Sequence, residues 1–117
     1  MINPVSEPII NEVLPALRSF VAQELDSRGY SQDEIAELLE VTQPAVSQYL
    51  NEQRGAAFDA IREDDELHTK ADTITSYIAQ RKREQVQDAY KDFITALIYR
   101  PDFEDIVDYD KQYFMDI

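Results

Sequence analysis

Apolar residues recur at steps of three and four along most of this chain, which is the spacing of one face of an α-helix. Near the N-terminus, for example, this spacing connects Leu14, Leu17, Val21 and Leu25. No alternation of apolar and polar residues persists, so strands are not indicated. Only two glycines occur among 117 residues, and so few turn formers fit long helices better than many short strands. The sequence therefore predicts an all-α fold.

Proline and glycine divide this helical pattern into separate elements. Pro15 lacks a backbone N–H, so we expect either a short helix before it and the main helix after it, or one kinked helix. Gly29 suits the left-handed residue that closes a helix. The stretch 66–99 is predicted to form one long helix or two helices in series. Pro101 is expected to end it and to begin a last short helix.

Residues 31–54 carry the most informative pattern. Ser31 and Glu34 have the spacing of a capping box, and Thr42 is a good N-cap for a following helix. A small residue, Ala36, suits a close helix crossing, and Val46 follows it at the separation that a helix-turn-helix requires. The segment therefore predicts a helix-turn-helix. The residues expected in the core of this motif are Ile35, Ala36, Leu39, Val41, Val46, Tyr49 and Leu50.

The second helix of this motif, expected at about residues 43–53, has an uncharged outer face. Residues 41–51 contain no charged side chain, although 30% of the chain is charged. Glutamine and asparagine can bond to adenine in the major groove of DNA, and acidic side chains that would repel phosphates are missing from this stretch. DNA binding is therefore favoured over a three-helix packing module, which is the structural alternative.

The motifs LPALR, SQDEIAELL and VTQPAVSQYL together resemble the DNA-binding domain of Cro/repressor-type (XRE-like) helix-turn-helix regulators. They are especially similar to small archaeal transcription regulators of that class, over residues 12–55. The resemblance implies that the second helix lies in the major groove. It implies base contacts by Gln43, Pro44, Ser47 and Gln48. The residues that it implies near the DNA backbone are Ser31, Gln32, Thr42, Asn51 and Arg54.

Two features depart from that family. The family's turn usually has glycine at the position of Glu40, and a non-glycine residue costs about 1 kcal/mol there if the backbone is left-handed. A distorted turn is therefore an alternative that the sequence leaves open. Related archaeal regulators often carry cysteines outside the motif, but this chain has none, so thiolate-based sensing is not implied.

The motif suggests a division of the chain into a helix-turn-helix DNA-binding domain at 1–62 and a helical dimerisation or regulatory region at 63–117. A small helix-turn-helix domain binds DNA weakly as a monomer, so we expect a homodimer. The alternative is that the apolar stripe of the C-terminal region packs on the N-terminal domain. The residues of this stripe, expected to form the dimer interface, are Leu67, Ile74, Ile78, Val86, Phe93 and Leu97.

The net charge of −13 argues against a nucleic-acid partner, because phosphate binding normally needs a basic surface. It favours an alternative function, a protein-interaction module that binds a basic partner and is antitoxin-like or regulatory, with the helix-turn-helix as scaffold. However, four lysines against 24 acidic residues resemble the composition of proteins from salt-loving archaea. In molar salt the Debye length is about 3 Å, so the repulsion is largely screened.

The chain lacks the side chains of most catalytic and metal-binding sites. It has no cysteine and a single histidine, His68, which excludes disulfides, thiolate metal sites and thiol nucleophiles. No glycine-rich phosphate loop is present. We therefore expect no enzyme activity and no cofactor. Asp64, His68 and Asp72 have the spacing of one helix face and could hold a divalent metal, but such charged faces are common, so no metal is expected.

No targeting or membrane segment is indicated. The first residues, MINPVSEPII, lack a basic start and a long apolar run, and no apolar stretch reaches about 18 residues. We expect a cytoplasmic protein with no membrane partner, and the sequence leaves a small-molecule or metal effector open. The one basic cluster, Arg81-Lys82-Arg83, is interpreted as a solvated face with local ion pairs in preference to a contact with flanking phosphates or with the acidic tail of a partner.

Overall fold

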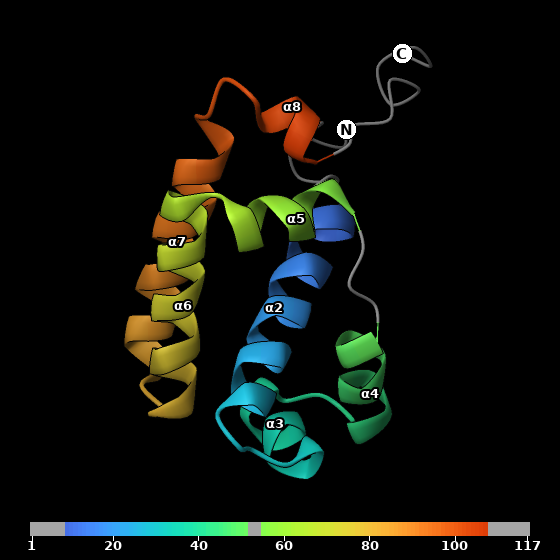
Figure 1. The fold of residues 1–117 in the computed structure, drawn as a ribbon. Helices are drawn as coiled ribbons and strands as arrows, with labels where there is room; N and C mark the ends of the chain where they lie inside the picture. Colours follow the sequence, from blue (N-terminus) through green and yellow to red (C-terminus); the bar gives the residue numbers. More distant parts are fainter. Residues whose placement is uncertain (1–8, 52–54, 108–117) are drawn as a thin grey trace, which may run out of the picture.

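The computed structural model describes residues 9–51 and 55–107, and every regular element in these residues is helical. This confirms the predicted all-α fold (Figure 1). The elements are a π-helical turn η1 (Ile9–Val13) and the α-helices α2 (Leu14–Ser27), α3 (Gln32–Leu39), α4 (Gln43–Asn51), α5 (Ala56–Glu63), α6 (Asp65–Ala79), α7 (Arg83–Ile98) and α8 (Phe103–Ile106).

The start and the end of α2 have local causes. Pro15 lies in the first turn of α2, where a missing N–H is tolerated, and the short π-helical turn precedes it. The π-helical turn runs into α2 without a break, because the junction residue Val13 has helical backbone with φ −77° and ψ −46°. The segment before Pro15 is therefore helical, as both alternatives expected, but it is continuous with the main helix. Gly29 ends α2 in left-handed backbone with φ 94°. The N–H of Tyr30 then donates to the carbonyl of Leu25 at 3.1 Å, which closes the helix end.

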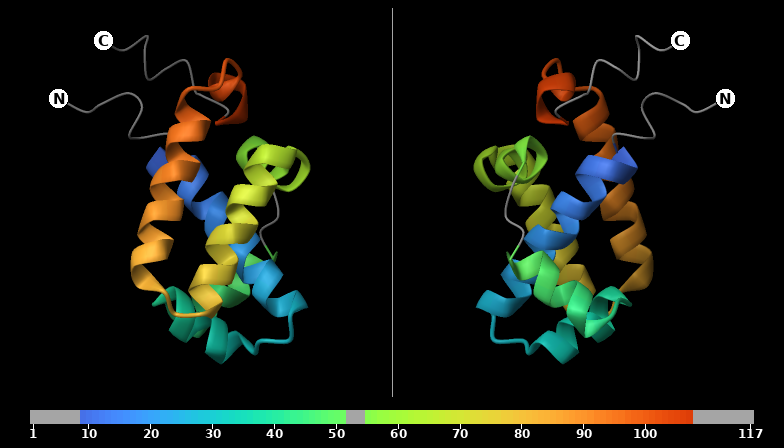
Figure 2. Two further views of the ribbon diagram at one scale, coloured as in Figure 1. Left: turned by 90° about the vertical axis from the view of Figure 1, so that its left-hand side faces the viewer. Right: turned by 90° about the vertical axis from the view of Figure 1, so that its right-hand side faces the viewer.

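Helix α2 lies between the α6–α7 pair and α4 (Figure 1). Helices α6 and α7 run antiparallel, side by side, and the turn between them places Arg81 in left-handed backbone with φ 58° (Figure 2). The predicted stretch 66–99 is therefore two helices. Buried side chains from both sides of residue 62 form one apolar cluster, so the predicted domain boundary does not coincide with a gap in the core.

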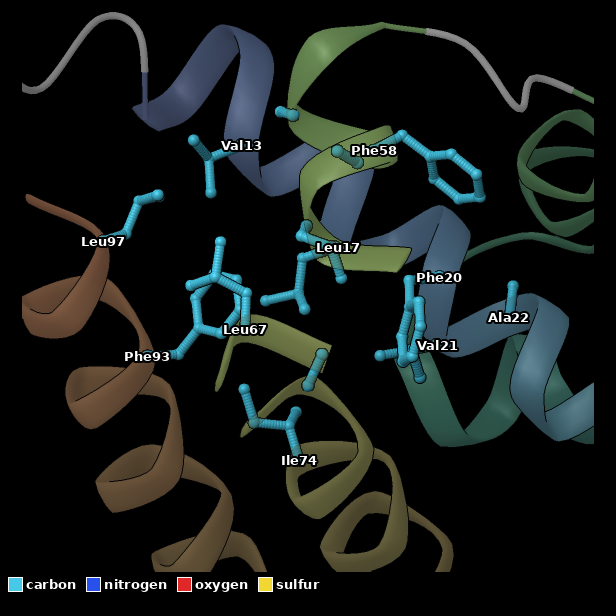
Figure 3. Close-up of a cluster of buried hydrophobic side chains, with 14 of the residues drawn as sticks. Val13, Leu17, Phe20, Val21, Ala22, Phe58, Leu67, Ile74, Phe93 and Leu97 are labelled. Atoms are coloured by element: carbon cyan, nitrogen blue, oxygen red, sulfur yellow. The ribbon is translucent and has the colours of Figure 1, made fainter. Parts of the chain in front are cut away.

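Most of the stripe predicted to form a dimer interface packs inside the chain instead. Leu67, Ile74, Phe93 and Leu97 are between 0 and 2% exposed. Figure 3 shows them gathered against the side chains of α2. Because one chain already covers these four side chains, they are not available to a partner, which corrects that part of the prediction. The remaining two residues of the stripe are half-buried and lie at the surface; they are Ile78 and Val86.

An ion pair between Asp64 and Arg100 connects the start of α6 to the residues that follow α7. Asp64 is the N-cap of α6, and its carboxylate accepts a hydrogen bond from the N–H of Leu67 at 3.0 Å. Arg100 donates to both oxygens of this carboxylate, at 3.2 and 2.7 Å, and also to Asp102 at 2.9 Å. Such two-point contacts between guanidinium and carboxylate fix geometry as well as charge.

Acidification is expected to weaken the fold through Asp64. The backbone N–H of Leu67 and, after it, the Arg100 guanidinium lower the pKa of Asp64. A carboxylate with a lowered folded pKa stabilises the protein above its unfolded pKa, and this contribution is lost as the pH falls through the folded pKa, here below about pH 4. At pH 7, Asp64→Asn should therefore lower the free energy of unfolding by about 1–2 kcal/mol, since asparagine still caps Leu67 but does not pair with Arg100.

Urea unfolding at several pH values checks this expectation. The gap between Asp64→Asn and the parent chain should stay nearly constant from neutral pH down to about pH 4, the unfolded pKa of aspartate, and should shrink as the pH is lowered further. Asp88→Asn is the matched control, because Asp88 is exposed on α7. A gap for Asp64→Asn that is the same at every pH contradicts the assigned role of the ionised carboxylate.

Candidate nucleic-acid interface

The first helix of the motif, α3, begins with the predicted capping box. The Ser31 hydroxyl accepts a hydrogen bond from the N–H of Glu34 at 3.1 Å, and the Glu34 carboxylate accepts one from the N–H of Ser31 at 2.9 Å. These two bonds satisfy backbone donors that the helix start leaves without partners. The same contacts with Ser31 lower the pKa of Glu34. The sequence pattern and the structure therefore agree on where α3 begins.

The turn between α3 and α4 is regular despite its missing glycine. Glu40 adopts left-handed backbone with φ 57° and ψ 45°. Its N–H donates to the carbonyl of Glu37 at 3.3 Å, and the N–H of Val41 donates to the carbonyl of Ala36 at 3.0 Å. This is the hydrogen-bond pattern of a Schellman helix end. The glutamate therefore takes the conformation of the expected glycine, and the turn is not distorted.

Glycine at position 40 is expected to stabilise the chain. Glu40→Gly should be about 1 kcal/mol more stable than Glu40→Gln, because both variants lose the ion pair with Arg83 but only glycine removes the crowded Cβ. Chemical denaturation of the two variants measures this difference. Equal stability of the two variants contradicts a strained turn.

Helix α4 starts at a threonine N-cap and packs on the core through a buried valine. The Thr42 hydroxyl accepts a hydrogen bond from the N–H of Ala45 at 3.2 Å, as an N-cap does. Val46 is fully buried, and α4 packs against both α3 and α2. The other residues expected in the core of the motif also face the interior. Ile35 and Ala36 are buried, and the partly buried residues that pack against the core are Leu39, Val41, Tyr49 and Leu50.

The outer face of α4 holds the residues expected to contact bases. Gln43, Pro44 and Gln48 are exposed, and Ser47 is half-buried. Thr42 and Asn51, expected near the DNA backbone, are exposed at the two ends of the helix, and the Asn51 amide donates to the backbone carbonyl of Ser47 at 2.9 Å. The expected backbone contact Arg54, and the end of the helix predicted at residues 52 and 53, lie outside the described residues.

A hydrogen bond between two glutamines joins the starts of the two helices. Gln43 is the first residue of α4, and its Nε2 donates to Oε1 of Gln32, the first residue of α3, at 2.5 Å. This bond leaves one Nε2–H and the Oε1 of Gln43 available to a further partner. A donor and an acceptor in this arrangement match N7 and N6 of adenine in the major groove. The sequence predicted a DNA contact for each residue separately. It did not predict their pairing, which depends on the helix crossing.

Two acidic side chains, one in α3 and one in the turn after it, pair with arginines at the junction of α6 and α7. Arg81 pairs with Glu37 at 3.3 Å, and Arg83 pairs with Glu40. The basic cluster therefore forms local ion pairs, as predicted, and connects the C-terminal hairpin to the helix-turn-helix. These pairs are exposed, so each contributes at most about 1 kcal/mol to stability.

The acidic and histidine side chains considered for a metal do not converge. Asp64 caps α6, Asp72 pairs with Arg28 at 2.8 Å, and His68 meets the ring of Phe20 edge-on with centroids 5.2 Å apart. Among residues 9–51 and 55–107, no three potential ligands gather in one place. Within the same ranges, no helix is long and apolar enough to span a membrane.

Comparison with known proteins supports the assignment of the motif. A family model described as helix-turn-helix matches residues 21–62. Searches of curated proteins and of solved structures found no match. The matched residues contain the whole of α3, α4 and their connecting turn, together with α5 through Arg62 and the second half of α2. The family model therefore matches the helix-turn-helix motif that the sequence pattern predicts.

Proposed function

We propose that this protein is a sequence-specific DNA-binding transcription regulator that acts as a homodimer with α4 in the major groove. The observation that carries the proposal is the exposed, uncharged end of α4, where Gln43 is held by Gln32. A side chain that is fixed before binding loses less conformational entropy when it contacts a base. The position of this pair at the starts of both helices suits a motif whose second helix enters the groove by its N-terminal residues.

The proposed contacts follow from the side-chain chemistry. Gln43 donates to N7 and accepts from N6 of one adenine, while the Gln32 amide donates to an adjacent phosphate. Pro44, Ser47 and Gln48 lie on the same outer side of α4 and contact neighbouring base edges. The residues proposed to fix the register on the DNA backbone are Ser31, Thr42, Asn51 and Arg54.

A dimer would bind two half-sites about 34–36 Å apart, one helical turn of DNA. Four residues of the predicted interface are buried within the chain, so the proposed homodimer uses another surface. Sedimentation of the free protein and of its DNA complex measures the stoichiometry. One chain per operator in the complex contradicts the dimer and leaves the contacts of α4 to be tested separately.

Selection from a pool of random DNA duplexes tests the proposed function. The selection is run at low salt and again at molar salt, with Gln43→Ala as the comparison protein. An enriched motif with two related half-sites is the expected result. If neither condition enriches a motif, DNA recognition is contradicted, and a protein-interaction module becomes the better account of the net charge of −13.

Binding to the selected site is expected to stay constant or to strengthen as salt rises from about 0.1 M to about 1 M. Helix α4 has no charged residue, and α3 exposes Asp33 and Glu34, so few phosphates are neutralised while repulsion is relieved by screening. A protein with 6–10 phosphate contacts instead loses about 10³–10⁵ in affinity between 50 and 200 mM salt. Fluorescence anisotropy across the salt series measures the slope, and a steep fall contradicts this expectation.

The variant Asp33→Asn sharpens the salt experiment. Asp33 is exposed next to the proposed phosphate contact Gln32. Removing its charge should strengthen binding at low salt and change little at molar salt, where the Debye length is about 3 Å. An equal effect at both salt concentrations would show that the residue acts through something other than repulsion.

A further inference from the structure

An apolar groove opens beside the helix-turn-helix, between α2, α6 and α7. It has a volume of about 340 Å³, and its walls include Val21 of α2, Ile78 of α6 and Val86 of α7. Leu39, the last residue of α3, also lines it. The groove adjoins a second hollow of about 270 Å³, with which it shares Leu39, Ile78 and Val86. A volume of this size lies at the lower end of the range that holds small ligands.

The charge around this groove differs from that of the rest of the chain. Although the chain has 24 acidic residues, none of the described residues that line the groove is acidic. Its one charged lining residue is Arg18, which is exposed. Within residues 9–51 and 55–107, Arg18 is also the one arginine without a carboxylate partner. The arginines that do form ion pairs there are Arg28, Arg62, Arg81, Arg83 and Arg100.

The hydroxyl-bearing side chain of Tyr90 lines the same groove as Arg18. Tyr90 belongs to α7 and is half-buried. Burial raises the pKa of Tyr90, and the nearby charge of Arg18 acts in the opposite direction. The amide of Gln87 lies on the same wall, one helical turn before the phenol position. The groove therefore combines an apolar floor with a guanidinium, a hydroxyl and an amide.

We propose that this groove binds a small amphipathic carboxylate, with the carboxylate on Arg18 and the hydrocarbon part on the apolar walls of α2, α6 and α7. An unpaired guanidinium recognises a carboxylate by two parallel hydrogen bonds. Tyr90 and Gln87 supply further donors. Burial of the hydrocarbon tail against the apolar walls removes apolar surface from water, which favours binding. A second copy of the chain is the alternative occupant, and the groove-filling variant below distinguishes it from a ligand.

Titration of the full chain with decanoate tests this site. Calorimetry gives the affinity, and backbone amide shifts locate the ligand, which should perturb Val86, Tyr90 and Leu39. Decanol and decyltrimethylammonium have the same tail but lack the negative charge, and both should bind at least about tenfold more weakly than decanoate. No DNA is needed, so failure here leaves the proposed DNA binding untouched.

Two single variants complete the test. Arg18→Gln should weaken decanoate binding about tenfold. Lys91→Gln, which removes an exposed cation of α7 outside the groove lining, should leave binding unchanged. The proposal is overturned if Arg18→Gln binds decanoate as well as the parent chain, if decanol binds equally tightly, or if the shifts fall elsewhere.

A groove-filling variant distinguishes a ligand from a second copy. Val86→Trp should abolish decanoate binding and leave the sedimentation coefficient of the protein unchanged. If Val86→Trp instead converts a dimer into monomers, the groove is an interface between copies of the chain, and the carboxylate site is overturned. Because Arg18 is exposed, the arginine variant keeps the test valid even if the tryptophan variant does not fold.

Discussion

Replacing Phe93 by alanine is expected to lower the free energy of unfolding by about 3–5 kcal/mol. The ring is fully buried, and Figure 3 shows it with Leu97 of the same helix, Leu67 of α6, Leu17 of α2 and Val13 of η1. Removing the ring takes away its transfer free energy and leaves a cavity that rigid helices on both sides fill only in part. Urea unfolding of both proteins measures the loss.

Measuring the loss in unfolding free energy at two protein concentrations shows whether Phe93 packs within one chain or between two chains. If Phe93 packs within one chain, the difference in unfolding free energy is the same at concentrations tenfold apart. If it formed the dimer surface predicted from the sequence, dilution of the parent chain would remove the difference, because dimer stability depends on concentration. Tyr99→Ala is the control, since Tyr99 follows α7 and is 82% exposed, and this change should cost less than about 0.5 kcal/mol.

The parts of the fold that follow from neighbouring residues could be predicted from the sequence. The capping box of Ser31 and Glu34, the cap at Thr42 and the helix end at Gly29 each depend on backbone groups within a few residues. Pro15 likewise acts on its own turn. Such features do not depend on how the helices are arranged in space, so the sequence is sufficient to locate them.

What the helix faces pack against could not be predicted in the same way. The spacing that joins Leu67, Ile74 and Phe93 shows that this face is buried, but periodicity is the same whether the covering surface belongs to α2 or to another chain. The chain reverses at Arg81, so that α7 folds back along α6 and the apolar face is covered within the same chain. Arginine gives no sequence signal for left-handed backbone, whereas a glycine at that position would have done so.

The candidate site shows the same limit. The uncharged stretch on α4 was visible in the sequence, but the bond between Gln32 and Gln43 joins residues 11 positions apart in two helices. The pairing of Arg83 with Glu40 depends in turn on where the α6–α7 turn lies. In the sequence, Arg18 is one charged residue among many and has no distinguishing pattern around it. It becomes distinctive only when the apolar walls beside it and the missing partner are known.

The exposed amide of Gln43 is expected to supply much of the selectivity of DNA binding. Gln43→Ala should cost about 1–3 kcal/mol of binding free energy at the selected site, a loss of about 5- to 150-fold, and relax the preference at one base pair. The reason is the loss of both hydrogen bonds to one adenine. Gln85→Ala, a change at an exposed position of α7 away from the motif, should have no effect. Unchanged affinity and unchanged preference for Gln43→Ala contradict the assignment.

The pairing with Gln32 gives this prediction a second, independent part. If Gln32 holds Gln43 in place, removing either side chain also removes part of what the other contributes. The double variant should therefore lose about 0.5–3 kcal/mol less binding free energy than the two single variants together. Full additivity would mean that the two glutamines bind DNA independently. Gln32→Ala alone should weaken binding to all sequences, because a phosphate contact carries no base preference, and should also blur the preference at the base pair of Gln43, because the positioning contact is lost.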